Sequence, residues 1–374
     1  MKTRSAIVRE APGEYEVVEL DLEEAGPGEL TVKLAASGLC HSDDHIATGD
    51  LPTGTYPFAG GHEGAGVVTK VGEGVTGFEV GDHVIFAFIP SCGRCRWCAT
   101  GQQNLCDIGA NMMVGSRFHD VTSYRLHLPS GEPVGQMAGI STFSEYTTVD
   151  VHSAIKIEKD VPLETVCLLG CGVGTGWGSA VNSAGVQIND TVIVMGIGGV
   201  GINAVQGAAH AGAGNVIAVD PVPFKLEMAE KVGATHSFAT MDEAAEYARS
   251  VTNGQGADAT IVTVGVTAAS HVMEAWNSIR KGGTCVVTGI GKPDEVAPPI
   301  SLMDLTLSQK RLQGSLFGAS APTRDIPRQV ELYRRGMLKL DELITHRYPL
   351  DQIAQAYRDM HAGKVVRGVI DYSL

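Results

Sequence analysis

The sequence is short of positive charge and contains no apolar run long enough to cross a lipid bilayer. Lys and Arg number 28 against 42 Asp and Glu, for a formal net charge of −14, which would repel phosphate backbones and anionic lipids. A spanning helix needs roughly 18 or more apolar residues, and the first ten residues lack the apolar stretch of a signal peptide. We therefore expect a soluble, cytoplasmic protein with no nucleic-acid or membrane partner.

Nothing in the sequence calls for disulfide bonds. Thiols stay reduced in the cytoplasm, so the eight cysteines are better explained as metal ligands, nucleophiles or core residues. Four of them follow the spacing C-x2-C-x2-C-x7-C, namely Cys92, Cys95, Cys98 and Cys106. A closed set of four thiolates favours structural zinc in loop 90–107, and an iron–sulfur cluster is the competing interpretation. The acidic charge balance argues against a zinc-ribbon module for nucleic acid.

The length of 374 residues favours two domains, each with its own core. Residues 6–148 are rich in Gly, Pro and short alternating runs, which is typical of strands joined by turns. From about residue 189 onward, continuous apolar runs alternate with helix-like stretches, which indicates a parallel sheet covered on both faces. We predict an α/β protein with a mostly β domain, a doubly wound parallel-sheet domain, and a tail from residue 340 that rejoins the first domain.

A dinucleotide fingerprint lies at the start of the second domain. Gly196, Gly198 and Gly201 form G-x-G-x-x-G directly after the apolar run 191–195, and Asp220 ends the next apolar run. Such glycines permit a tight turn and close approach of a pyrophosphate, while the acid bonds the adenosine ribose. A carboxylate there repels the extra phosphate of NADP, so we predict NAD. The alternative is a glycine turn that serves only packing.

Three further residues have the chemistry of an open zinc site. Cys40, His62 and Cys171 lie far apart in the sequence, each in a glycine-rich stretch. Two thiolates and one imidazole would leave a fourth position for water or substrate, as catalytic zinc requires. Spacing alone does not establish that the three residues meet.

Together these motifs, in this order, resemble the zinc-containing medium-chain alcohol dehydrogenases over essentially the whole chain. The shared signatures are G-H-E-x-x-G around His62, the four-cysteine motif, G-C-G-x-x-T-G around Cys171, and the glycine turn. The resemblance implies a GroES-like catalytic domain at 1–172, a Rossmann NAD-binding domain at 173–318, and a return to the catalytic domain at 319–374. It also implies that Cys40, His62 and Cys171 bind the catalytic zinc, giving two zinc ions per chain.

By the same resemblance, the enzyme is a zinc-dependent alcohol dehydrogenase that transfers hydride reversibly between a primary or small alcohol or aldehyde and NAD, through a zinc-bound alkoxide. Ser42 and His45 would pass the released proton outward, Asp43 would orient His62, and Glu63 would approach the metal from behind. Ser42 and Asp43 have an alternative role as a helix cap. His45 could instead be a solvated loop histidine.

The resemblance also assigns contacts to the cofactor and the substrate. The cofactor-binding set comprises His41, Thr175, Gly196, Gly198, Gly199, Val200, Gly201, Asp220, Lys225 and Arg367. The substrate pocket would be lined by Phe88, Met137 and Trp177, with segment 112–140 at its entrance. Glutathione-dependent formaldehyde dehydrogenases of this family carry an arginine where this chain has Ala110, which argues against that substrate.

The sequence as a whole also resembles an actinobacterial, nicotinoprotein branch of the family. In that branch NAD(H) stays bound and is reoxidised by a nitroso-dimethylaniline dye or another external acceptor. We carry this branch as an alternative to an ordinary enzyme that releases NAD. A zinc-free quinone or enone reductase and a non-catalytic NAD-binding protein are less favoured, because neither needs the three metal-type residues. The family implies a homodimer, with a tetramer as the alternative.

Overall fold

The computed structural model describes residues 1–296 and 298–374. These residues form two units, each with its own core. Unit 1 consists of Met1–Cys171, Ala321–Gly336 and Leu340–Leu374, and unit 2 consists of Gly172–Ser320 and Met337–Lys339. Strand-rich unit 1 and the alternating strands and helices of unit 2 make the protein α/β.

Unit 1 contains a closed barrel and a seven-stranded sheet. The barrel strands are β1 (Lys2–Val8), β2 (Glu16–Leu22), β4 (Phe58–Ala59), β7 (Leu126–His127) and β8 (Pro133–Gln136). The sheet strands are β3 (Glu29–Gly38), β5 (Glu63–Val71), β6 (His83–Phe86), β9 (Tyr146–Asp150), β10 (Ala154–Ile157), β17 (Ile344–Tyr348) and β18 (Arg367–Asp371). Its helices are α1 (His41–Thr48), α2 (Arg96–Ala99), α3 (Leu163–Val166), α10 (Pro322–Arg334) and α11 (Ile353–His361).

Strand β3 is central to unit 1 because β5, β9 and β18 all pair with it antiparallel. Its apolar side chains Leu30, Val32 and Leu34 are buried in one hydrophobic cluster, as alternate positions of a strand require. Residues of β18 reach β3 from the far end of the chain. Strand β18, near the carboxyl terminus, is therefore part of the same sheet as β3.

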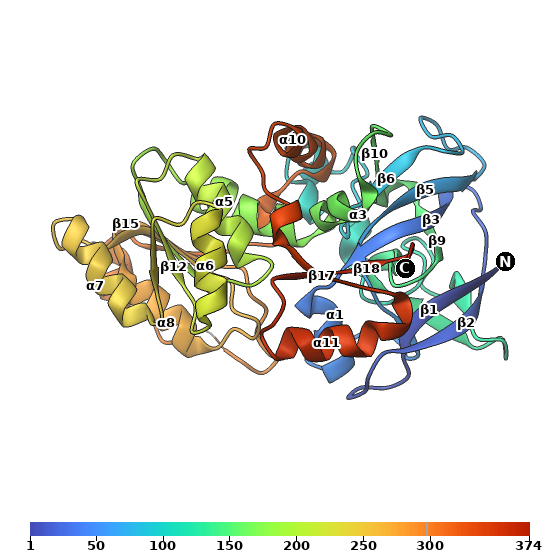
Figure 1. Ribbon diagram of the computed structural model, residues 1–374, viewed down its shortest axis with the longest axis horizontal. Helices are drawn as coiled ribbons and strands as arrows, with labels where there is room; N and C mark the ends of the chain where they lie inside the picture. The colour runs from blue at the N-terminus through green and yellow to red at the C-terminus, as the bar shows by residue number, and fades with distance from the viewer. Residues whose placement is uncertain (297) are drawn as a thin grey trace. The chain divides into compact units, whose positions relative to one another are not determined.

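Helix α11 lies beside α1, as Figure 1 shows, although the two are far apart in the sequence. His361 Nε2 lies 2.8 Å from Asp44 Oδ2. The Tyr357 hydroxyl donates to the Cys40 carbonyl at 3.4 Å, and the Tyr15 ring stacks on Tyr357 with centroids 5.4 Å apart. These contacts hold the turn at Cys40 against the core.

Unit 2 is a six-stranded parallel sheet in the order β13-β12-β11-β14-β15-β16, surrounded by helices (Figure 1). The strands are β11 (Thr191–Met195), β12 (Asn215–Val219), β13 (His236–Phe238), β14 (Ala257–Val262), β15 (Ile279–Val287) and β16 (Arg311–Gly314). The helices are α4 (Gly172–Gly178), α5 (Gly201–His210), α6 (Pro223–Lys231), α7 (Met241–Val251), α8 (Ala269–Ser278) and α9 (Leu302–Leu307). All five residues of β11 are buried, as expected for a strand covered on both faces.

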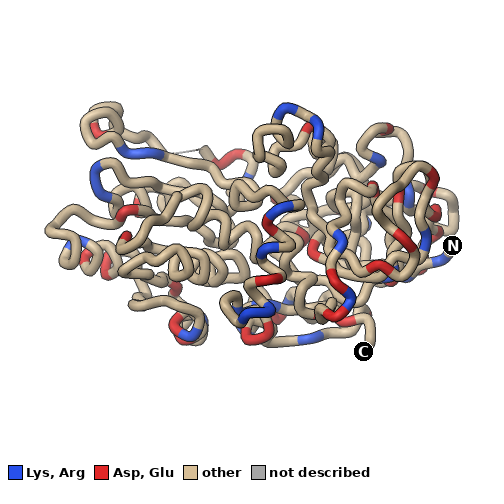
Figure 2. Tube along the Cα trace, turned by 90° about the horizontal axis from the view of Figure 1, so that it is seen from above, with Lys and Arg blue, Asp and Glu red and all other residues tan. Residues whose placement is uncertain are grey.

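Residues of both charge signs are interspersed along the trace in Figure 2. None of the described helices combines the length and apolarity that a bilayer crossing requires.

Candidate metal and cofactor sites

Four potential ligand residues converge at one end of the β3–β5 pair in unit 1. One ligand atom from each of Cys40, His62, Glu63 and Cys171 lies within 4.8 Å of the others. Strand register explains part of this convergence, because Gly38 pairs with Glu63. Cys40 follows Gly38 by two residues and His62 directly precedes Glu63, so both emerge at the same end of the sheet.

Two details of this site fit a bound metal. His62 is buried, and its Nδ1 lies 2.9 Å from Asp43 Oδ2, while Asp43 Oδ1 accepts from the Gly61 amide at 2.8 Å. An imidazole that donates through Nδ1 presents the lone pair of Nε2. His62 Nε2 is itself buried without a protein hydrogen-bond partner, which costs free energy unless a metal ion occupies that position. Two thiolates and an imidazole are the donor set of zinc.

The electrostatics of the cluster also suit a cation. A hydrogen bond from the Cys171 thiol and, secondarily, the nearby His62 lower the pKa of Cys40 well below its ordinary value, although burial opposes them. Burial alone would lower the pKa of His62, but the charges of Asp43 and Cys40 outweigh it and raise this pKa well above its ordinary value. The cluster thus stabilises a positive charge, which either a proton on His62 or a bound metal ion can supply.

Glu63 and Arg367 form a fully buried ion pair beside the cluster. Arg367 Nη2 donates to the Glu63 carboxylate and also to the Leu39 carbonyl, the latter at 3.3 Å. The Glu63 carboxylate can lie against the backbone of residue 38 because that residue is glycine: a Cβ at Gly38 would lie 2.2 Å from Glu63 Oε2. Arg367 is predicted from the sequence as a cofactor-binding residue, and its pairing with Glu63, 304 residues away, is not foreseen there.

The predicted proton-relay residues lie on α1. Ser42 Oγ is 3.8 Å from Cys40 Sγ. His45 is only 4% exposed, so it is not a solvated loop histidine, and its Nδ1 lies 3.6 Å from Asp50 Oδ2. Asp50, which the sequence analysis did not single out, is partly exposed and extends this line of polar groups toward solvent. Asp43 directs its carboxylate to Gly61 and His62 rather than acting as a helix cap.

The four-cysteine motif forms a second cluster, in which all four Sγ atoms lie within 4.8 Å of one another. Cys92 Sγ and Cys98 Sγ are 3.9 Å apart, close to the ~3.8 Å expected between thiolates on one tetrahedral zinc. Backbone amides donate to three of the sulfurs, and the amide of Cys98 lowers the pKa of Cys95 to about 6. Four sulfurs this close together fit a single zinc ion better than an iron–sulfur cluster, in which each cysteine would bind its own iron.

The glycine turn of unit 2 has the form of a dinucleotide cradle. A Cβ at Gly201 would lie 1.8 Å from the Gly196 carbonyl oxygen, whereas a Cβ at Gly198 would meet no protein atom within 4 Å. Asp220 Oδ2 accepts from the Ile197 amide at 2.8 Å and lies 3.7 Å from Lys225 Nζ. Gly201 therefore serves packing, while Gly198 leaves space that a cofactor can enter at the amino terminus of α5.

The other predicted residues divide between the two units. Phe88 of unit 1 has its ring 5.6 Å from the His62 ring, and Met137 is buried in the hydrophobic cluster against which Phe88 packs. His41 is exposed at the start of α1. In unit 2, Thr175 and Trp177 are buried on α4, and the Trp177 ring lies 4.8 Å from the His210 ring of α5, a partner that the pocket prediction did not include.

Comparison with known proteins gives consistent results along the chain. A family model described as the alcohol dehydrogenase GroES-like domain matches residues 26–159, and one described as zinc-binding dehydrogenase matches residues 199–334. The chain is 49% identical to an NDMA-dependent alcohol dehydrogenase from Amycolatopsis methanolica, over 100% of both chains. Among solved structures, it is similar to an alcohol dehydrogenase zinc-binding domain protein from Burkholderia ambifaria (31% identity, TM-score 0.91) and to benzyl alcohol dehydrogenase from Acinetobacter calcoaceticus (28%, 0.88), each over 99% of both chains.

Substituting one cysteine in each cluster separates the two metal sites. We expect Cys171→Ser to lower the zinc content from about two ions to about one per chain and to leave the melting temperature nearly unchanged, because the open site adds little to folding. Cys106→Ser should also lose about one zinc ion but reduce folded yield and melting temperature, because structural zinc contributes directly to folding. Elemental analysis and thermal denaturation measure both effects. Retention of both zinc ions by Cys171→Ser would contradict the ligand assignment.

Alanine substitution at two glycines of the turn distinguishes packing from cofactor contact. We expect Gly201→Ala to lower the melting temperature of the nucleotide-free protein, because its Cβ has no room against a backbone carbonyl. Gly198→Ala should leave that temperature unchanged and weaken NAD binding by about tenfold or more, because the new methyl group occupies the cradle. Calorimetric titration with NAD and thermal denaturation are the measurements. Equal NAD affinity in wild type and Gly198→Ala would refute the cradle.

Proposed function

The chain belongs to the zinc-containing medium-chain alcohol dehydrogenases, and from this premise we propose that it oxidises small primary alcohols with an NAD that stays bound and is reoxidised in place by an external acceptor. Its membership makes it an oxidoreductase that takes zinc and NAD and acts on small alcohols or aldehydes. The observation that carries the finer proposal is the 49% identity, over the full length, to a relative named for its dependence on NDMA.

In this proposal Cys40, His62 and Cys171 hold the catalytic zinc, and the four-cysteine motif holds the structural one. When bound, the catalytic zinc polarises the alcohol hydroxyl and lowers its pKa, and NAD serves as the two-electron acceptor. Asp43 keeps the His62 imidazole oriented through their 2.9 Å contact. The buried pair of Glu63 and Arg367 backs the site with no net charge.

Proton removal is assigned to α1. Ser42, next to Cys40, would take the proton from the alcohol, and His45 would pass it outward to Asp50 near the surface. The 3.6 Å separation of His45 and Asp50 supports the outer part of this route. An imidazole suits the task because its ordinary pKa lies near neutrality.

Substrate and coenzyme choice follow from the side chains around each site. Phe88 and Met137 give the His62 side of the site an apolar surface, which suits an aliphatic or aromatic alcohol. Asp220, whose carboxylate already bonds the Ile197 amide of the turn, repels the additional phosphate of NADP and favours NAD. A zinc-free reductase has no use for three metal-type donors brought together in one cluster, so that alternative is not favoured.

The same proposal includes a homodimer joined through unit 2. Strand β16 is the last strand of the sheet, and all four of its residues are exposed. The adjoining helix α9 exposes Leu302, Met303 and Leu307 by 71% or more. An unpaired edge next to apolar side chains is a template for pairing with a second copy about a two-fold axis. A tetramer is the alternative.

We also propose the domain boundaries 1–172, 173–318 and 319–374. We further propose a cytoplasmic location, which suits eight free thiols.

Bound coenzyme is the property that tests the main proposal. We expect protein passed through gel filtration to retain about one NAD(H) per chain and to bleach nitroso-dimethylaniline with an alcohol and no added NAD. Cys171→Ser is the control, because it should keep the nucleotide and lose alcohol oxidation. If the eluted protein carries no nucleotide and turns over only with added NAD, the coenzyme is a dissociating cosubstrate and the finer proposal is wrong.

A charge on α9 tests the dimer. We expect Leu307→Asp to weaken self-association by about tenfold or more, because it replaces an apolar interface contact with a carboxylate. Ile188→Asp is the matched control: Ile188 is 85% exposed in unit 2 outside the edge formed by α9 and β16. Sedimentation velocity over a concentration series measures both. Equal association of the two variants would exclude this edge as the interface.

A further inference from the structure

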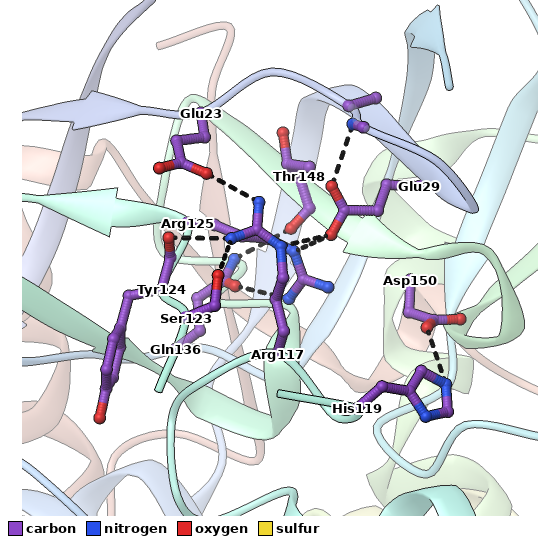
Figure 3. Close-up of polar contacts among 12 residues, drawn as sticks. Glu23, Glu29, Arg117, His119, Ser123, Tyr124, Arg125, Gln136, Thr148 and Asp150 are labelled. Atoms are coloured by element: carbon purple, nitrogen blue, oxygen red, sulfur yellow. Dashed lines mark hydrogen bonds and ion pairs between the residues drawn. The ribbon is translucent and has the colours of Figure 1, made fainter. Parts of the chain in front are cut away.

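The buried carboxylate of Glu29 bonds two arginines of the segment that lies between the four-cysteine motif and β8 (Figure 3). Glu29, at the start of β3, is 6% exposed and accepts from Arg117 Nε at 2.9 Å and from Arg125 Nε at 2.8 Å. Burial would raise the pKa of Glu29, but the two guanidinium groups outweigh it and lower this pKa below its ordinary value. The carboxylate is therefore charged, and both arginines bond to an anion inside the protein.

Each arginine extends this contact to further parts of the segment. Arg117 also donates to Ser123 Oγ, the Tyr124 carbonyl and Glu23, which ties the loop 117–124 into one piece. Arg125 donates to Gln136 Oε1 at 3.1 Å. Gln136 in turn donates to Thr147 Oγ1 and the Thr148 carbonyl of β9. The path from Glu29 thus reaches the residue directly before Met137.

Apolar side chains of the segment belong to the same hydrophobic core as Phe88, the ring beside His62. Met113 and Phe88 pack against the hydrophobic cluster that contains Met137, and the Phe88 ring lies 5.6 Å from that of His62. Met113 is four residues before Arg117, and the Gly115 carbonyl between them accepts from the Gln136 amide at 2.8 Å. The two methionines are therefore held by backbone next to the two arginine anchors.

We propose that Arg117, through Glu29 and Arg125, is a positioning residue that fixes segment 112–140 and thereby sets the size of alcohol that the enzyme accepts. The inference rests on the proposed alcohol-oxidising function. Glu29 begins the same strand whose other end leads to the metal ligand Cys40, so the anchor fixes the apolar wall relative to the metal cluster.

Arg117 is the informative member of the network. Arg125 is 2% exposed, so its removal would leave a buried void and an underpaired carboxylate and endanger the fold. His119 offers a second link from the segment to Asp150, but at 3.9 Å with a side chain 65% exposed it is screened and weak. Arg117 has a side chain 21% exposed, and without it the Arg125–Glu29 pair remains.

The test compares Arg117→Ala and Arg117→Lys with Lys70→Ala. Lys70 lies near the network, 2.7 Å from Glu24, in an exposed ion pair that does not involve segment 112–140. Ethanol and benzyl alcohol are used with each protein, together with the bound zinc and NAD content. We expect Arg117→Ala to raise KM for ethanol by about fivefold with little change in kcat, because a loosened wall holds a small alcohol poorly. The preference for benzyl alcohol over ethanol in kcat/KM should rise by about fivefold. Arg117→Lys should restore part of the difference, and Lys70→Ala should match wild type.

The outcomes separate this inference from the proposed function. If Arg117→Ala loses activity equally on both alcohols, or only melts at a lower temperature, the arginine is merely structural and the inference is overturned. The same holds if Lys70→Ala changes the preference as much as Arg117→Ala does. If wild type oxidises neither alcohol while carrying zinc and NAD, the proposed function fails, and this inference fails with it.

Discussion

Desolvation of the metal cluster is the constraint on which unit 1 depends. Cys171 is buried, Cys40 is partly buried, and His62 and Glu63 are buried beside them. Anionic groups held this closely in a low-dielectric interior are costly unless cations balance them. Arg367 balances Glu63, and a divalent ion bound by the cluster would balance the two thiolates. The charges of the cluster therefore balance when a divalent ion is bound, and the side chains that carry them come from four separate parts of the chain.

The backbone around the cluster reflects the same constraint. Gly38 leaves room for Glu63, and Gly61, with φ of 89°, presents its amide to Asp43. The hydroxyls of Tyr15 and Tyr357 bond the carbonyls of Asp43 and Cys40. These hydrogen bonds limit where Asp43 and the turn at Cys40 can move. Such preorganisation keeps donors in place without the metal having to gather them.

Sequence reasoning succeeded where the chemistry is local. The four-cysteine motif spans fifteen residues, and the strand, glycine turn and acid from 191 to 220 follow one another directly, so spacing alone indicates their geometry. Cys40, His62 and Cys171 could be grouped only through family resemblance, because their meeting depends on the β3–β5 register. The partners of Arg367 and Trp177 carried no local signal: Glu63 is 304 residues from Arg367, and ring contacts such as Trp177 with His210 depend on tertiary packing.

Strand β3 connects these observations. Its carboxyl end leads to Cys40, its amino end carries Glu29, and three other strands pair with its ten residues. Because β3 is hydrogen-bonded on both edges, its backbone is fixed along its length. Residues at its two ends therefore keep a constant separation. The turn that carries Cys40 and the segment that bears Met113 and Met137 are therefore both attached to β3. A loop anchored only to itself would leave the apolar wall free to shift against the ligands, whereas an anchor on β3 makes the distance between them a property of the sheet.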